Sequence, residues 1–252
     1  MLSQYQREIE TLQRHRNGFT FAGHHSSEFG LTVERFPQQQ TPAARLTEIR
    51  VPGRNGSMHI DDGTFENVRK TYQCYIHRGI SLPAAVHEIN AWLLGGSGYR
   101  DLTDGYDHNR IRRAMFVGPM DIENVLNRFG RCKIVFDCLP QVYSPESFQT
   151  REYTSPTEIC TSNFPAKPMI TVYGTGAGTI AVGTVRVQIK NIDGEIVLDS
   201  ETQNAYKMQQ GTMVNKNRDI VAPEFPTLRG PTKISWSGGV TKIAIQTREW
   251  CL

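Results

Sequence analysis

The sequence predicts a mainly β protein of two β-sandwich domains, with one α-helix in the N-terminal domain. Glycine and proline, which mark turns, are frequent at 22 and 13 of 252 residues. Many short segments alternate apolar and polar residues, which is the two-residue period of a half-buried strand. Residues 144–165 are rich in Ser, Thr and Pro and lack sustained periodicity. We therefore predict an N-terminal domain at 18–143, a linker at 144–165 and a C-terminal domain at 166–252.

Residues 1–17 are expected to form an N-terminal helical extension. Apolar residues recur there at three- and four-residue spacing, at Leu2, Tyr5, Ile9 and Leu12. The extension either docks on a neighbouring molecule or is a frayed end. Strands are predicted next, at 19–21 and 29–36.

The pair His24-His25 falls between these two strands. Adjacent histidines seldom point at one metal, and neither an HExxH motif nor a pair of carboxylates accompanies them. We therefore predict a solvated turn.

The segment from Ile49 to Ile76 has the densest turn signals of the chain. Pro52-Gly53 suits a type II turn, and Asn55-Gly56 favours the type I′ turn of tight hairpins. Asp62-Gly63 marks a further turn. From Val68 onward, apolar residues alternate cleanly with polar ones. The segment is therefore predicted as strand, tight loop, strand, turn, strand.

Residues 81–94 form the clearest predicted helix. Ser81 suits the N-cap, and Pro83 suits the first turn. An apolar stripe with Trp92 beside it is expected to cover the core, at Leu82, Val86, Ile89 and Leu93.

An acidic loop at 104–109 follows the helix. Its carboxylates could bind calcium, but they lack the regular ligand spacing of an EF-hand, so a solvated loop is favoured. Gly118-Pro119 interrupts the strand region 111–126, which implies a bulge or an edge position. Residues 132–138 alternate again and predict a strand.

The C-terminal half consists of short alternating segments separated by Gly turns, from MITVYG and GTIAVG to TKISWSGG and TKIAIQ. This spacing is typical of a β-sandwich. Gly174–Gly178 (GTGAG) resembles a phosphate loop only in composition, because no helix follows it. We predict a hairpin turn there.

Charge and cysteine content narrow the classes of function. A net charge of +3 does not by itself argue for nucleic-acid binding. No apolar run approaches the roughly 18 residues of a membrane span. The cysteines fit neither a CxxC metal site nor a small disulfide framework, so we expect reduced thiols and no metal or cofactor. They are Cys74, Cys132, Cys138, Cys160 and Cys251.

Two ordered series of motifs resemble one protein family. The N-terminal series is FTFAGHHSSEFGLTVER, IRVPGRNGSMHID and VRKTYQCYI. The C-terminal series has an Asp-Ser pair after an Ile/Val strand, a Phe-Pro-x-Leu step and a closing strand with Arg and an aromatic residue. Here these are Asp199-Ser200, Phe225–Leu228, Arg248 and Trp250. Over about residues 18–252 the chain resembles the distal tail proteins, the baseplate hubs of long-tailed, non-contractile bacteriophages. Gly230-Pro231-Thr232 departs from the Gly-x-Asn turn that is more frequent in that family.

The resemblance implies a structural hub at the tail tip of a virion, assembled in the host cytoplasm. In that family the N-terminal domains form a hexameric ring whose lumen can pass DNA. The ring faces bind the tail-tube protein and tail-tip proteins. The C-terminal domains are galectin- or carbohydrate-module-like sandwiches that hold receptor-binding or adhesion proteins.

The turn segment is also the predicted ring interface. Turns that need glycine cost backbone entropy, and an Arg fork beside them can bind a neighbour's carboxylates or carbonyls at two points. We expect six residues at or near a subunit interface: Arg50, Pro52, Gly53, Arg54, Asn55 and Gly56. The alternative is a solvated surface hairpin.

A binding module and an enzyme are the alternatives to the hub. A lectin-like, carbohydrate-binding adhesion module would stack aromatic rings on sugars, at Tyr173, Tyr206, Trp236 and Trp250. For Trp236 and Trp250, core packing is favoured over sugar contact. An enzyme is not expected, because the sequence has no GxSxG motif, no supported Cys-His pair and no metal-ligand spacing.

Overall fold

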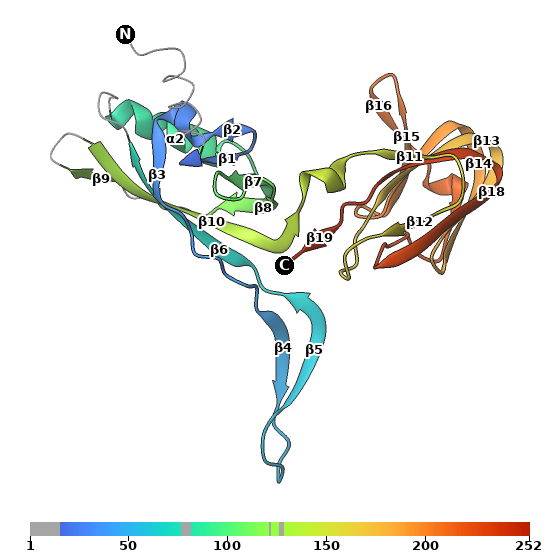
Figure 1. Cartoon of the computed structure of the whole chain (residues 1–252), viewed down its shortest axis with the longest axis horizontal. Coiled ribbons are helices and arrows are strands. Elements are labelled where there is room, and N and C mark those ends of the chain that lie inside the picture. The colour runs from blue at the N-terminus through green and yellow to red at the C-terminus, as the bar shows by residue number, and fades with distance from the viewer. Residues whose placement is uncertain (1–15, 77–81, 121, 126–128) are drawn as a thin grey trace. The chain divides into compact units, whose positions relative to one another are not determined.

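The computed structural model describes residues 16–76, 82–120, 122–125 and 129–252 (Figure 1). It divides into two compact units: the first runs to Val142 and takes in Leu252, and the second is Tyr143–Cys251. Strands dominate both units, which confirms the predicted mainly β class. Nearly all of the expected extension at 1–17 lies outside the described residues.

The first unit is built on a curled sheet with strand order β2-β1-β7-β8-β10-β6-β3, and helix α2 covers its core (Figure 1). β9 also pairs with β10, and β4 with β5 forms a separate two-stranded sheet. The elements are β1 (Phe19–Phe21), β2 (His24–His25), η1 (Ser26–Phe29), β3 (Leu31–Arg35), β4 (Ala44–Ile49), β5 (Met58–Phe65), β6 (Val68–Ile76), α2 (Leu82–Leu94), β7 (Arg100–Asp104), β8 (Ile111–Phe116), β9 (Ile122–Val125) and β10 (Phe129–Tyr143).

Aromatic side chains fill the core between the sheet and α2. Phe19 and Phe21 of β1 lie 5.7 and 6.2 Å, centroid to centroid, from Trp92 of α2. The Trp92 Nε1–H donates to the Phe21 carbonyl at 3.0 Å, so the buried indole keeps a hydrogen-bond partner. Phe136 of β10 lies 4.7 Å from Phe21 and closes the cluster.

Helix α2 buries the stripe that its sequence predicts, with one shift. Ile89, Leu93 and Trp92 are buried, as expected. Ala85 is the buried residue one turn earlier, whereas Val86 is only partly buried.

Strand β6 buries every second residue, as the alternation predicts. It pairs with β10 in an uninterrupted antiparallel register in which Cys74 is opposite Cys132 and Val68 is opposite Cys138. The same inward face carries a charged residue, Lys70, which is 2% exposed.

The turn expected at the histidine pair has a structural role that the sequence did not indicate. His25 is the N-cap of η1, and its Nδ1 accepts from the Ser27 N–H at 3.2 Å. Gly18 packs so closely on the His25 ring that a Cβ there would overlap it. The prediction of a merely solvated turn is therefore wrong for His25.

The second unit is a sheet with strand order β11-β18-β13-β14-β15-β16, in which β12 also pairs with β18 and β17 with β14. Its elements are η2 (Pro145–Phe148), β11 (Arg151–Tyr153), β12 (Thr157–Cys160), β13 (Met169–Val182), β14 (Val185–Asp199), β15 (Asn204–Gln209), β16 (Thr212–Asn215), η3 (Asn217–Asp219), β17 (Ile220–Val221), β18 (Pro231–Gln246) and β19 (Trp250–Cys251).

The short strands predicted in this half are parts of three long, bent strands, β13, β14 and β18. Gly174–Gly178 lies in the middle of β13, where the register with its neighbours shifts, so the predicted hairpin turn is wrong. Residues from both halves of β13, such as Ile170 and Ile180, share one core cluster. The sheet therefore folds over on its own core, and glycine bulges form the bend.

The segment predicted as a linker, 144–165, forms paired strands. Its two strands, β11 and β12, both pair with β18, and the whole segment belongs to the second unit. Ser, Thr and Pro mark irregular surface chain here without preventing strand pairing.

Candidate interaction surfaces

The predicted interface segment forms an exposed hairpin, here residues 44–65. β4 and β5 pair with each other and with no other strand in the described part of the chain (Figure 1). Every residue of β4 is exposed, and so is every residue of β5 except the partly buried Phe65. An isolated two-stranded hairpin is marginally stable in water, so a surface that covers it would stabilise it.

The two faces of the exposed hairpin differ in chemistry. Directly paired residues share a face, and one face carries the pairs Ile49–Met58 and Thr47–Ile60. Met58 and Ile60 are 41% and 50% exposed. The opposite face carries Glu48 paired with His59 and Leu46 paired with Asp61. Three of the four residues on the first face are apolar, against one of four on the second, so the first is the apolar face, and the described residues leave it open.

The turn at the tip agrees with prediction in part. The Arg54 N–H donates to the Val51 carbonyl at 3.2 Å, and Gly53 has φ 79°, as a type II turn over Pro52-Gly53 requires. Gly56 also has φ 79°, but Asn55 is not among the residues with positive φ. The type I′ prediction for Asn55-Gly56 is therefore wrong, because that turn needs positive φ at both positions.

Asp62-Gly63 is predicted to form a turn but lies inside β5. Ala44 pairs with Phe65 and Leu46 pairs with Asp61, so two steps along β4 correspond to four steps along β5. The additional residues of β5 form a bulge. The Asp61 carboxylate accepts the Gly63 N–H at 2.8 Å, which gives the bulge a local hydrogen bond.

The charged residues at the tip are exposed. Arg50 is 86% exposed in its side chain and lies 3.4 Å, Nε to Oε1, from Glu48. The Ser57 hydroxyl donates to the same carboxylate. The hydrogen bonds from Ser57 and Arg50 lower the pKa of Glu48, and the one from Ser57 has the larger effect. Arg54 is exposed, with no salt bridge among the described residues. Both guanidinium groups are thus accessible to a partner.

The two tryptophans proposed for sugar stacking pack against the core of the second unit. Trp250 stacks on Phe164 at 4.6 Å between centroids, and its Nε1–H donates to the Pro165 carbonyl at 3.1 Å. Trp236 is opposite the fully buried Ile180, so it lies on the core side of the sheet.

The two tyrosines lie on the other side of that sheet. Lys242 Nζ lies 4.7 Å from the centroid of the Tyr173 ring, so the ammonium group covers one face of that ring. The Tyr206 hydroxyl lies 3.7 Å from Met169 Sδ. The four aromatic residues therefore do not share one stacking surface.

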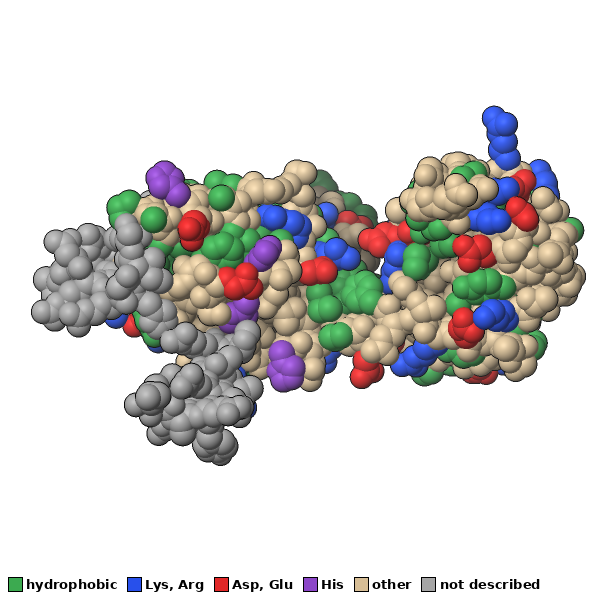
Figure 2. Space-filling view, turned by 90° about the horizontal axis from the view of Figure 1, so that it is seen from above, with side chains coloured by type: hydrophobic (Ala, Val, Ile, Leu, Met, Phe, Trp, Pro, Cys, Tyr) green, Lys and Arg blue, Asp and Glu red, His purple; other side chains and the backbone are tan. Residues whose placement is uncertain are grey.

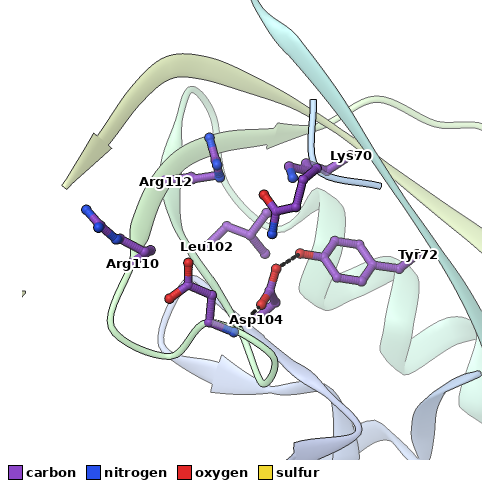
Figure 3. Close-up of a pocket in the computed structure, with 8 residues that line it drawn as sticks. Lys70, Tyr72, Leu102, Asp104, Arg110 and Arg112 are labelled. Carbon is purple, nitrogen blue, oxygen red and sulfur yellow. Dashed lines mark hydrogen bonds between the residues drawn. The ribbon is translucent and has the colours of Figure 1, made fainter. Parts of the chain in front are cut away.

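The acidic loop of the first unit borders a small polar pocket (Figure 3). The Tyr72 hydroxyl donates to Asp104 Oδ2 at 3.4 Å, and Asp104 Oδ1 accepts the Asp107 N–H at 2.8 Å. Lys70 Nζ donates to the Gln38 carbonyl at 3.4 Å, and burial lowers the pKa of Lys70. Burial, then the Asp104 charge, raises the pKa of Tyr72. The cavity measures about 10 Å³, enough for one water molecule.

This pocket was missed because its members are far apart in the sequence. One signal was available: Lys70 occupies an inward position between Val68 and Tyr72 in the alternation of β6. A charged residue at such a position predicts a buried polar partner. The partner of Lys70 is the Gln38 carbonyl, and the nearby Asp104 charge favours its charged form.

Three further observations bear on function. No group of three or more His, Cys, Asp or Glu side chains in the described ranges could hold a metal ion. Within the same ranges, no helix is both long and apolar enough to cross a membrane. On the face drawn in Figure 2, Lys and Arg side chains are interspersed with Asp and Glu instead of being gathered by sign.

Known proteins were compared with the chain by sequence and by structure. No protein-family model matches it, and no curated protein matches its sequence. Among solved structures it is similar to SPP1 Dit (gp 19.1), described as a paradigm of the hub adsorption apparatus in phages that infect Gram-positive bacteria. The TM-score is 0.73 at 11% identity, over 93% of this chain and 99% of that chain. The chain therefore has the fold of SPP1 Dit, in agreement with the resemblance carried by its motifs.

Proposed function

We propose that the chain is the structural hub of a phage tail tip. Six first units close into a ring that joins the tail tube to tail-tip proteins, and the second units hold receptor-binding or adhesion proteins. The observation that carries this proposal is the shared fold with SPP1 Dit over nearly the whole of both chains. The hub would be assembled in the host cytoplasm and carried in the virion, with DNA passing through the lumen.

The exposed hairpin is the proposed contact between neighbouring subunits. A closed ring needs a heterologous interface, in which one patch of each subunit meets a different patch of the next. A projecting two-stranded arm with an open apolar face suits the inserting side of such an interface. Full burial of a side chain such as Ile60 or Met58 would contribute about 1.5–3 kcal/mol each.

The charged tip would give that contact its specificity. Arg50 and Arg54 lie on either side of the turn at Gly53, and the turn fixes the direction in which the chain leaves each strand. Guanidinium groups bind carboxylates or carbonyls in two-point geometry, which sets the register of an interface.

Location in the virion is the direct test of the hub. Gold-labelled antibodies against the chain, applied to virions that carry it, should mark the tail tip. Labelling of the capsid or along the tail shaft would contradict the proposal. Antibodies against a capsid protein of the same virions are the control for specificity.

A further inference from the structure

Two buried cysteines lie opposite each other on adjacent strands of the first unit. Cys74 of β6 and Cys132 of β10 are direct register partners, and they are 1% and 5% exposed. Opposed residues of antiparallel strands have Cα atoms about 4.5–5.5 Å apart. Disulfides span Cα separations of roughly 4.4–6.8 Å. The backbone therefore holds these two thiols at a separation that a disulfide can bridge.

The thiols are chemically unequal. A hydrogen bond between them raises the pKa of Cys74 well above its usual range and lowers the pKa of Cys132. The thiolate is the form that attacks a disulfide, so the lowered pKa favours Cys132 as the thiol of the pair that ionises first.

A cavity borders this pair, although the cysteines themselves are almost fully buried. It measures about 570 Å³ and is lined by Cys74 and Cys132 together with Arg131 and Lys133. Arg131 Nη2 lies 2.9 Å from Glu34 Oε1, and Lys133 is exposed on the outer face of β10. Glu34 also lines the cavity, so Arg131, Lys133 and Glu34 together leave one net positive charge there, which favours an anionic reagent.

We propose that Cys74 and Cys132 form an oxidation site that closes to a cross-strand disulfide when the chain meets a small-molecule disulfide such as oxidised glutathione. The Cys132 thiolate attacks one sulfur of the reagent, which releases one glutathione thiolate. Cys74 then loses its proton to solvent and attacks the Cys132 sulfur, which displaces the second glutathione. The protein gives up two protons and two electrons, and the reagent is reduced to two thiols.

The other cysteines lack this arrangement. Cys138 is buried on the same face of β10, but it is opposite Val68. Cys160 and Cys251 belong to the second unit. The new bond would close a loop that contains α2, β7, β8 and β9, which restricts the unfolded chain and stabilises the first unit.

The test is oxidation of the full, reduced chain with oxidised glutathione, followed by digestion without reduction. We expect one peptide pair that joins Cys74 to Cys132, with a mass about 2 Da below the sum of its reduced peptides. The melting temperature of the oxidised chain should rise by about 5 °C or more. Cysteines that remain free, that carry only separate glutathione adducts or that link to other cysteines would overturn the proposal.

Two variants sharpen this result. Cys132→Ala should abolish both the linked peptide and the rise in melting temperature, whereas Cys138→Ala removes an equally buried thiol from the same strand and should keep both. If Cys132→Ala does not fold, the linked peptide of the wild-type chain still decides the question alone.

Discussion

Arg248 and Asp199 are joined across the second unit by an ion pair of 2.8 Å between Nη1 and Oδ1, with side chains only 17% and 10% exposed. Arg248 has φ 48°, a left-handed conformation that a non-glycine residue adopts at a cost. Its N–H donates to the carbonyl of the buried Ser147 at 2.9 Å. One residue thus connects η2, the end of β14 and the segment after β18. Both Asp199 and Arg248 belong to the motifs that carried the family resemblance.

Replacing Arg248 with Met should destabilise the second unit by about 3 kcal/mol, because the Asp199 carboxylate would stay largely buried without its partner. Denaturant unfolding followed by tryptophan fluorescence measures the change. Lys242→Met breaks the more exposed pair with Glu152, 36% and 55% exposed, and should cost less than about 1 kcal/mol. Equal midpoints for Arg248→Met and wild type would refute the role of the pair.

The bend of β18 should be intolerant of a side chain. A Cβ at Gly239 would overlap the carbonyl oxygen of Thr175, so Gly239→Ala requires the backbone to move. We expect a loss of roughly 3 kcal/mol or more, as for other overpacked sites. Gly194→Ala is the control. Gly194 has φ 79°, but a Cβ there would meet no neighbouring atom, so this substitution should lower the free energy of unfolding by only about 1 kcal/mol. Thermal melting compares the two, and similar losses would contradict the close approach of the strands.

Lys70→Met should raise the stability of the first unit at neutral pH. Burial lowers the pKa of Lys70 in the folded chain, while the unfolded chain keeps a pKa near 10.5. Below both values the cost of burying the ammonium is fully present. Between them the unfolded chain binds more protons, so wild-type stability rises with pH. The advantage of Lys70→Met should therefore shrink as pH approaches 10.5.

Melting temperatures of the two proteins, measured from pH 7 to 10.5, check this expectation. Lys133→Met changes an exposed lysine of β10 and should leave the melting temperature unchanged at every pH. An advantage of Lys70→Met that stays constant with pH would show that packing, and not charge burial, causes it.

The sequence predicted features that depend on local pattern. The alternation of β6 and the apolar stripe of α2 follow from strand and helix periodicity, and the structure has both. The Pro52-Gly53 turn follows from the allowed φ of its two residues.

Features that depend on distant contacts were missed. The glycines at 174–178 predict a turn, because local pattern cannot distinguish a turn from a bulge in a continuous strand. The facing of Cys74 and Cys132 is a matter of strand register, which no local pattern fixes. The pocket lined by Lys70 and Asp104 likewise cannot be predicted without the order of the strands in the sheet.

Arg54→Glu tests whether the tip of the exposed hairpin contacts a neighbouring subunit. Breaking a buried charge pair should weaken each interface by about 3–5 kcal/mol. The concentration at which rings form should therefore rise by at least about 100-fold. Light scattering across a dilution series measures it. Arg151→Glu makes the same charge change on exposed β11 of the second unit and should assemble as wild type does. Unchanged assembly of Arg54→Glu would remove Arg54 from the interface.

Native mass measurement can show whether six chains close into a ring through the apolar face of the exposed hairpin. Ile60→Asp places a carboxylate on that face, whereas His59→Asp places one on the opposite face, one residue away. Because both positions are exposed, neither change should unfold the monomer. We expect six chain masses for wild type and His59→Asp, and one chain mass for Ile60→Asp. A wild-type chain that stays monomeric at every concentration, or an Ile60→Asp chain that assembles as wild type does, would rule out a ring formed through this face.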